Sequence, residues 1–320
     1  MKVAVDAVGG DHYPYNPVKG VVAALDHDDD LEVILLGPED IVNEELEDKE
    51  YDSSRIQVEH APQIIDMKEA PSQAVKKKRN SSIVKGLSLH AEGKCNAFIS
   101  TGNTGALLAA STFILGKLEG VIRPTVATYF PTMKGYRLLV DAGANLELKP
   151  EMYVQFALMS SIYCQEIMNI DHPEIALLNV GEEEEKGTDN LKEAYKALAD
   201  LSNFIGNVEG RDILPGKADV VVCDGFTGNV LLKFGESVPE MLELLVGQAV
   251  KESGMGDDLK QKFLAILQEA LSDFDYENVG GLPFLGVDGI SMVGHGGSPP
   301  RAIKNMILNA AEASRANLND

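Results

Sequence analysis

Residues 95–117 read CNAFISTGNTGALLAASTFILGK, and this stretch decides the fold that the sequence predicts. Its first five residues suit a short buried strand, and residues 106–117 are rich in Ala and Leu, which indicates a helix. The loop between them combines two glycines with hydroxyl side chains, at the point where a helix begins with free backbone amides. We therefore expect phosphate or another oxyanion to bind at Ser100, Thr101, Gly102, Asn103, Thr104 and Gly105. A capped helix start without a ligand would produce the same pattern.

The tripeptide Thr-Gly-Asn of this loop occurs a second time, at residues 227–229. It again follows a short apolar stretch, residues 219–223, and precedes a segment with a helical pattern. Two loops of similar composition at two strand ends favour one cleft built from both.

Other predicted strands also end in polar, glycine-containing loops. Residues 6–12 follow an apolar strand at 3–5, and residues 141–145 follow one at 136–140. Strands that alternate with helices predict a mostly parallel sheet covered on both faces, and ligands of such sheets bind at the carboxyl ends of the strands. The residues expected to shape the site are Asp6, Gly9, Gly10, Asp11, Asp141, Asn145, Thr227 and Gly228.

Two ionisable residues are candidates for chemistry in these loops. Lys186 follows four consecutive glutamates and precedes a predicted helix that ends near residue 199. A lysine at a helix start opposes the helix dipole, so it is available to an anion bound there. His295 lies in the loop before the last predicted helix, where a histidine serves as a structural hydrogen-bond partner about as often as it transfers a proton.

Composition excludes several classes of protein. The chain has 320 residues, enough for one large domain or two closely packed halves, and its formal net charge of -22 argues against nucleic-acid binding. The spacings typical of catalytic metal sites, P-loops and dinucleotide-binding turns are absent from the sequence, so we expect neither a metal nor a cofactor. The three cysteines are far apart, which indicates structural thiols in a reducing, cytoplasmic setting. The longest apolar stretch, residues 105–116, is too short to span a bilayer.

Several segments together resemble a known family. Residues 6–11, 100–107, 141–145, 179–187, 224–233 and 280–298 occur in the order and spacing of the bacterial phosphate acyltransferase of phospholipid synthesis. This resemblance covers nearly the whole chain, with small departures at Val8, where methionine is usual, and Val279, where tyrosine is common. It implies that the protein converts fatty acyl-acyl carrier protein and inorganic phosphate into acyl phosphate. It also implies a homodimer of single-domain chains (residues 1–320), each a three-layer α/β/α fold with a mixed sheet similar to isocitrate and isopropylmalate dehydrogenases and to phosphotransacetylase.

The implied reaction fits the residues of the loops. Phosphate is itself the nucleophile, so the protein needs chiefly to hold two anionic substrates and to stabilise a tetrahedral oxyanion. We assign phosphate to residues 100–105 with Lys186 as its countercharge, and Asn229 as a donor to the oxyanion. His295 protonates the departing thiolate, orients phosphate or is structural. A phosphotransacetylase acting on acyl-CoA is the nearest alternative; an NAD-linked dehydrogenase and a membrane-docked scaffold are further ones.

Two surface features are assigned to partners. Lys76, Lys77, Lys78 and Arg79 form a basic run near the end of a short helix; such a run is usually a solvated helix end, but an acidic acyl carrier protein favours docking there. Residues 237–278 are predicted to form an amphipathic helical hairpin with three lysines against nine Asp and Glu residues. We expect weak, reversible membrane contact through this hairpin, which would deliver acyl phosphate to a membrane-bound glycerol-3-phosphate acyltransferase; packing against the core or across a dimer is the alternative.

Overall fold

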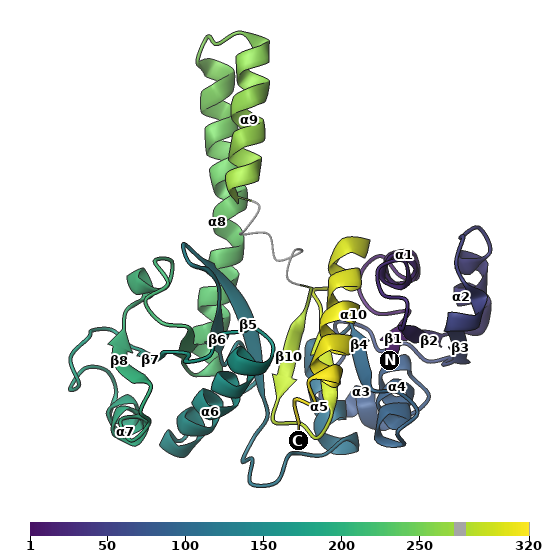
Figure 1. Cartoon of the computed structure of the whole chain (residues 1–320), viewed down its shortest axis with the longest axis horizontal. Coiled ribbons are helices and arrows are strands. Elements are labelled where there is room, and N and C mark those ends of the chain that lie inside the picture. Colours follow the sequence, from purple (N-terminus) through teal and green to yellow (C-terminus); the bar gives the residue numbers. More distant parts are fainter. Residues whose placement is uncertain (272–279, 320) are drawn as a thin grey trace.

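The computed structural model describes residues 1–271 and 280–319. In these residues the strands form one 11-stranded sheet in the order β3-β2-β1-β4-β11-β10-β5-β6-β9-β7-β8 (Figure 1). The strands are β1 (Lys2–Asp6), β2 (Glu32–Gly37), β3 (Ile56–His60), β4 (Ala97–Ser100), β5 (Thr125–Thr132), β6 (Gly135–Val140), β7 (Ile175–Leu178), β8 (Phe204–Val208), β9 (Val220–Val222), β10 (Leu282–Leu285) and β11 (Ile290–Val293). The helices are α1 (Tyr15–Leu25), α2 (Glu39–Leu46), α3 (Pro71–Lys77), α4 (Ser82–Ala91), α5 (Thr104–Ile114), α6 (Pro150–Glu166), α7 (Asp189–Leu198), α8 (Gly225–Glu252), α9 (Asp257–Leu271) and α10 (Pro300–Arg315), with 3-10 turns η1 (Ser53–Arg55) and η2 (Gly210–Asp212).

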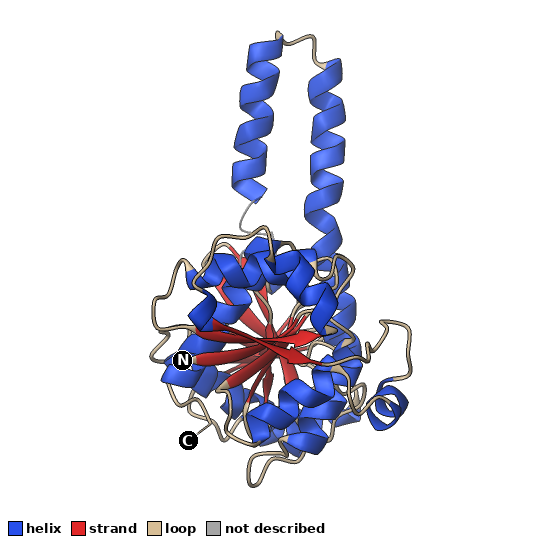
Figure 2. Cartoon of the chain, turned by 90° about the vertical axis from the view of Figure 1, so that its right-hand side faces the viewer, coloured by secondary structure: helices blue, strands red, loops and turns tan. Residues whose placement is uncertain are grey.

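Helices cover both faces of the sheet, because successive residues of a strand point to opposite sides. Val3 and Val5 of β1 pack with α1 and α10, whereas Ala4 between them packs with α3, α4 and α5. In the other half, α6 and α7 cover one face and the start of α8 covers the other. Figure 2 shows the resulting three layers. The predicted α/β/α fold with a mostly parallel, mixed sheet is therefore confirmed.

Strand β5 joins two halves whose strands run in opposite directions. Towards the first half, Val126 pairs antiparallel with Phe284 of β10, which in turn leads to the parallel strands β11, β4, β1, β2 and β3. Towards the second half, Ala127 pairs antiparallel with Val140 of β6, followed by the parallel strands β9, β7 and β8. The carboxyl ends of β4 and β11 on one side, and of β6 and β9 on the other, therefore meet near the middle of β5. Parallel sheets bind ligands at these ends, so both halves contribute to one site.

A helical hairpin projects from this body. α8 continues well beyond the sheet and returns as α9, as both views show (Figures 1 and 2). Several large apolar side chains on it are exposed, among them Leu244 and Ile266. The two expected helices are confirmed, while the end of the predicted insertion, residues 272–278, lies outside the described residues. Among the helices that the structure describes, none is long and apolar enough to cross a membrane.

Residues 282–285, which follow two glycines, form β10, and this strand closes the gap between β11 and β5. One local expectation is wrong. The second Thr-Gly-Asn tripeptide is not a loop before a helix: α8 begins at Gly225, where the Asp224 carboxylate caps it by accepting a hydrogen bond from the Thr227 amide at 2.8 Å. Asp224, and not Asn229, therefore corresponds to Asn103, the cap of α5.

Candidate active site

A cavity of about 970 Å³ lies along β5, between α5 of the first half and α8 of the second. Its middle is polar, with Thr104 and Gly105 from α5, Asn145 from the loop after β6, Asn229 from α8, and His295. These residues come from sequence positions that are almost 200 apart, and they meet because the carboxyl ends of the two half-sheets meet. The volume is at the upper end of the usual range for small-molecule sites.

Only part of the predicted phosphate loop, residues 100–105, lines the cavity; the rest supports it from behind. Thr104 and Gly105 line the cavity, whereas Ser100, Thr101, Gly102 and Asn103 are buried behind it. The Ser100 hydroxyl donates to the Asp6 carboxylate at 2.6 Å, and the Thr101 hydroxyl donates to the carbonyl of Gly9 at 3.1 Å. Thr104 and Gly105 occupy the first two positions of α5, where backbone amides have no carbonyl partner within the helix. An anion in the cavity would therefore meet these two amides and the Thr104 hydroxyl.

Asp6 and Asp141 hold the loops that surround the cavity. The Asp141 carboxylate accepts hydrogen bonds from the amides of Gly143, Ala144 and Asn145, at 3.0, 2.9 and 2.7 Å, and from the Asn145 side chain at 2.8 Å. Burial raises the pKa of the Asp141 carboxyl, and burial likewise raises the pKa of Asp6 although the Ser100 hydroxyl opposes this. Both carboxylates are committed to backbone and hydroxyl donors, so the geometry gives them a supporting role.

Three further predicted site-shaping residues, Gly9, Gly10 and Asp11, lie in the loop after β1. The Asp11 amide donates to the Gly296 carbonyl at 2.8 Å, which ties this loop to the His295 loop. Gly10 has φ +84°, and a side chain there would also collide with the Gly296 carbonyl and the Thr101 hydroxyl. Gly9 lies against Asp6 and the Gly102 amide in the same way. Close backbone packing therefore accounts for both glycines.

Asn229 faces the cavity from the first turns of α8. Its side chain makes no hydrogen bond with any residue that the structure describes, so the amide N–H groups are available to a ligand. Gly143, with φ +121°, lies directly opposite, since a Cβ there would come within 3.4 Å of the Asn229 side chain. Gly228 packs on the Asp141 carbonyl, where a Cβ would clash at 1.9 Å, and the Thr227 hydroxyl donates to Asp224 at 2.9 Å. The start of α8 is thus fixed against the loop after β6.

His295 lies at the rim of the cavity and is exposed. Its Nδ1 accepts a hydrogen bond from the Gly297 amide at 3.2 Å. An accepting Nδ1 places the ring proton of a neutral imidazole on Nε2. The histidine is therefore arranged to donate a hydrogen bond through Nε2.

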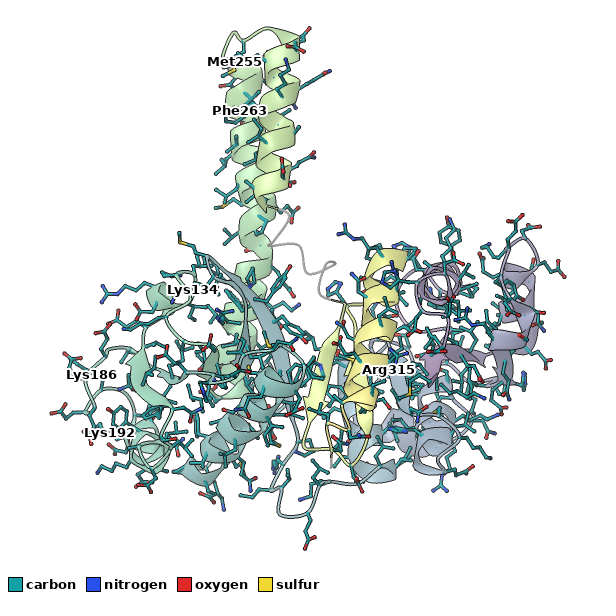
Figure 3. All side chains as sticks on the ribbon, viewed as in Figure 1. Lys134, Lys186, Lys192, Met255, Phe263 and Arg315 are labelled. Atoms are coloured by element: carbon teal, nitrogen blue, oxygen red, sulfur yellow. The ribbon has the colours of Figure 1, made fainter. Side chains whose placement is uncertain are left out.

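The structure does not bring Lys186 to the cavity. Lys186 lies on the loop between β7 and α7, at the outer edge of the second half (Figure 3). Its ammonium is 3.9 Å from the Glu183 carboxylate, and it is half exposed. Lys233 is the cation that lines the cavity from α8, one helical turn after Asn229, and its ammonium pairs with Glu236 at 2.8 Å. The sequence contained the signal for Lys233, since residues four apart share one face of a helix.

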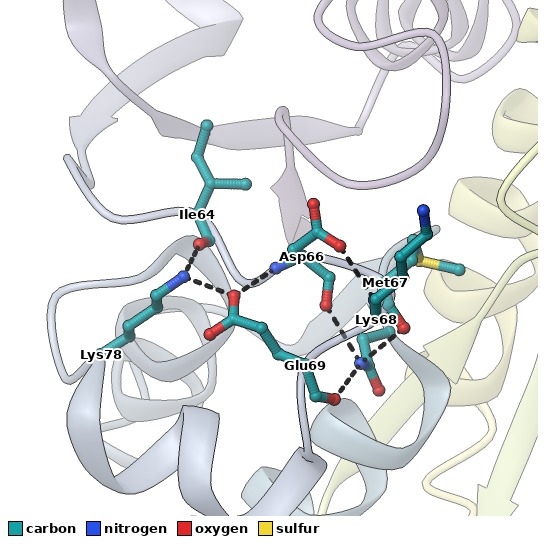
Figure 4. Close-up of polar contacts among 7 residues, drawn as sticks. Ile64, Asp66, Met67, Lys68, Glu69 and Lys78 are labelled. Atoms are coloured by element: carbon teal, nitrogen blue, oxygen red, sulfur yellow. Dashed lines mark hydrogen bonds and ion pairs between the residues drawn. The ribbon is translucent and has the colours of Figure 1, made fainter.

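The four residues of the basic run, 76–79 at the end of α3, do not all have the same role. Lys76, Lys77 and Arg79 are exposed, but Lys78 forms an ion pair with Glu69 and donates to the Ile64 carbonyl at 2.6 Å (Figure 4). The loop that Lys78 holds is also bound by Asn103, whose side-chain amide donates to the carbonyls of Asp66, Met67 and Glu69. Lys78 thus supports the loop packed against the start of α5.

The three cysteines are free and buried. Burial raises the pKa of Cys95 to about 11 and that of Cys164 to about 12, and it raises the pKa of Cys223 well above its ordinary value. Thiols of this kind are poor nucleophiles at neutral pH. None of the three lines the cavity.

Comparison with known proteins gives the family. Residues 1–320 match the family described as "Fatty acid synthesis protein". The chain belongs to this family. A phosphate acyltransferase from Chlorobaculum parvum is 47% identical over 331 residues, which cover 100% of this chain and 97% of that protein. The chain is accordingly an acyltransferase.

Solved structures support the same fold at low sequence identity. A phosphotransacetylase from Streptococcus pyogenes matches with a TM-score of 0.65 and 18% identity, over 99% of this chain and 94% of that one. A 4-hydroxythreonine-4-phosphate dehydrogenase from Klebsiella pneumoniae matches with a TM-score of 0.54 and 13% identity, over 98% and 97% of the two chains. The expected likeness to phosphotransacetylases and to a dehydrogenase-like fold is confirmed at the level of architecture.

Proposed function

We propose that this acyltransferase moves a fatty acyl group from the thiol of acyl carrier protein to inorganic phosphate, and so supplies acyl phosphate to phospholipid synthesis. The observation that carries the proposal is the cavity along β5, where hydrogen-bond donors at the centre lie between apolar walls. The sequence relatives named phosphate acyltransferase support the same reaction.

In the proposed reaction, phosphate lies at the amides of Thr104 and Gly105 with Lys233 as its countercharge. A phosphate oxygen attacks the thioester carbonyl, and the carbonyl π electrons move to its oxygen, which accepts a hydrogen bond from the Asn229 amide. The oxyanion then collapses, the C–S bond breaks, and the electron pair leaves with sulfur. His295 Nε2 donates a hydrogen bond to the departing thiolate, and the thiolate takes its proton from solvent. Positioning and electrostatic stabilisation supply the rate, and no covalent enzyme intermediate is needed.

We assign docking of the acidic carrier protein to Lys76, Lys77 and Arg79. Ser72, one turn before Lys76 on α3, lines the cavity, so a carrier bound at these cations lies close to its mouth. Lys78 is left out because it holds the Glu69 loop. Opposite charges across such an interface accelerate association and make it sensitive to salt.

The docking assignment predicts a selective defect. Replacing Lys76, Lys77 and Arg79 with Glu should raise KM for acyl-acyl carrier protein, flatten its salt dependence and leave KM for phosphate unchanged. The matched control carries the same charge change on the hairpin, at Lys251, Lys260 and Lys262, and should keep the KM of wild type for the carrier. A change confined to KM for phosphate would refute the assignment.

The alternative is a phosphotransacetylase-like reaction with acyl-CoA, and the structural likeness to phosphotransacetylases favours it. Steady-state kinetics with palmitoyl-acyl carrier protein and palmitoyl-CoA, each with phosphate, separate the two. We expect acyl phosphate from both thioesters but a kcat/KM at least about tenfold higher for the carrier-bound one, the equivalent of roughly 1.4 kcal/mol. A preference for acyl-CoA would establish the alternative.

The hairpin formed by α8 and α9 is our candidate for reversible membrane contact. Phe263 of α9 is 43% exposed, and Met255 lies at the tip of the hairpin (Figure 3). Its acidic character means that attraction must come from apolar area and not from anionic lipid. In vesicle flotation, wild type should float weakly on neutral and anionic vesicles, and Leu259→Glu/Phe263→Glu should not. Equal flotation of the two proteins would show that the hairpin does not contact the membrane and serves as a core or dimer element. The proposed homodimer is testable separately, by sedimentation equilibrium.

A further inference from the structure

The apolar residues that line the cavity fall into two groups, one on each side of its polar centre along β5, which we call the first and the second arm. The first arm follows one face of α5, with Leu108, Thr112 and Phe113, and continues to Arg123 and Pro124 before the start of β5. The second arm follows the later residues of β5, Phe130 and Pro131, towards the base of the hairpin. From Pro124 to Pro131 the strand advances roughly 23 Å, so each arm takes a chain of several carbons.

The second arm is walled by one face of α8. Leu231, Phe234, Gly235 and Val238 lie at helical spacing and all line it. Phe234 is 68% exposed, and Leu214 on the opposite wall is 46% exposed, so an apolar ligand between them would cover surface that is now in contact with water. The second arm thus favours an alkyl chain.

The first arm ends in cations. Lys117 donates to the carbonyls of Val121 and Ile122, both at 2.9 Å. Arg123 makes no side-chain hydrogen bond or ion pair with any other described residue, and it lines the cavity. A guanidinium binds phosphate groups well, and the phosphopantetheine that carries the thioester has a phosphodiester at its far end. The first arm thus suits the carrier's prosthetic group.

Phe130 and Gly235 meet inside the second arm. Gly235 lies in the interior of α8, where glycine is less favourable than alanine, so its presence needs a reason in packing. A Cβ at this position would lie 2.8 Å from Cζ of the Phe130 ring. The absence of a side chain at Gly235 therefore decides where the ring of Phe130 rests.

We infer that the fatty acyl chain lies in the second arm and that Phe130, positioned against Gly235, sets the chain length accepted. This inference rests on the proposed function and adds the site that selects the acyl group. Gly235→Ala pushes the ring into the arm and should shift the preferred acyl chain to a shorter one. Phe130→Leu opens the arm and should shift it to a longer one. Each methylene of the acyl chain that is no longer buried in the arm should lower kcat/KM about fourfold.

The test measures kcat/KM with phosphate for a series from octanoyl- to stearoyl-acyl carrier protein. The double variant Gly235→Ala/Phe130→Leu should return towards the wild-type profile, because the leucine makes room for the added methyl group. Leu108→Ala, which enlarges the first arm, should keep the wild-type chain-length optimum. The inference is overturned if neither second-arm variant moves the optimum, or if Leu108→Ala moves it as far.

A second readout separates failure of this inference from failure of the proposed function. Displacement of a fluorescent fatty acid by unlabelled fatty acids of different length reports on the arm without catalysis. If the wild-type enzyme formed no acyl phosphate from any thioester, the proposed function would be refuted. If the displacement series then also showed no difference between wild type and Gly235→Ala, the acyl arm would be refuted with it.

Discussion

Asn229→Ala gives the sharpest test of the catalytic centre. The Asn229 side chain faces the cavity, lies opposite Gly143 and has no hydrogen-bond partner among the described residues, so it is a free donor at the place where the thioester must lie. Loss of one oxyanion donor costs about 2.7 to 4 kcal/mol, so kcat should fall about 100- to 1000-fold. Stability should change by less than about 0.5 kcal/mol, because an exposed side chain without partners is removed and Ala suits a helix at least as well as Asn.

The assay is release of free carrier thiol under saturating phosphate, with thermal unfolding as the check on folding. Asn229→Asp keeps the shape but replaces the donor with a negative charge, so it should lose more activity than Asn229→Ala. Val230→Ala, next in the chain and exposed outside the cavity, is the matched control and should retain the kcat of wild type. A folded Asn229→Ala enzyme with kcat within threefold of wild type would refute the assigned role.

Three further predictions address the charges and thiols. Lys233→Met should raise KM for phosphate and lower the rate at limiting phosphate at least about tenfold, because a charge-assisted hydrogen bond worth about 1.5 to 3 kcal/mol is lost. Lys186→Met should have a smaller effect, because Lys186 does not line the cavity. If phosphate kinetics showed the reverse order of the two variants, Lys186 would again be the countercharge. Replacing all three cysteines with Ala should leave turnover in place because they are buried with raised pKa values; a folded but inactive protein would require a cysteine in the chemistry. Asp6→Asn should change the pH dependence of unfolding: since burial raises the Asp6 pKa, the unfolded chain ionises first, and wild type should lose stability relative to the variant as pH rises above about 3.8 until the folded carboxyl ionises. Urea unfolding at several pH values measures this difference, and a constant difference would contradict it.

The sequence predicted the layers of the fold and the central loop, because strand, glycine loop and amphipathic helix are all local patterns. It did not predict which loop residues face the cavity. Ser100 and Thr101 looked like donors to phosphate, but they satisfy Asp6 and Gly9, whose positions depend on a strand nearly 100 residues away. Local patterns cannot show which partner a hydroxyl group finds.

The apolar arms could not be predicted from the sequence for a different reason. Phe130, Leu231 and Phe234 have the spacing of ordinary core residues, and it is the packing of α8 over β5 that leaves space between them. The choice between Lys186 and Lys233 likewise depends on strand order. β7 is separated from β6 by β9, which places the Lys186 loop away from the cavity.

The central claim is that phosphate attacks the thioester directly in the cavity along β5. The most direct measurement is exchange of label between palmitoyl-acyl carrier protein and radiolabelled free carrier protein, first without phosphate and then with it. Direct attack predicts no exchange without phosphate, and acyl phosphate equal to the thiol released once phosphate is added. Exchange in the absence of phosphate would demonstrate an acyl-enzyme intermediate, and thiol release without acyl phosphate would exclude phosphate as the acceptor; either result would contradict the account.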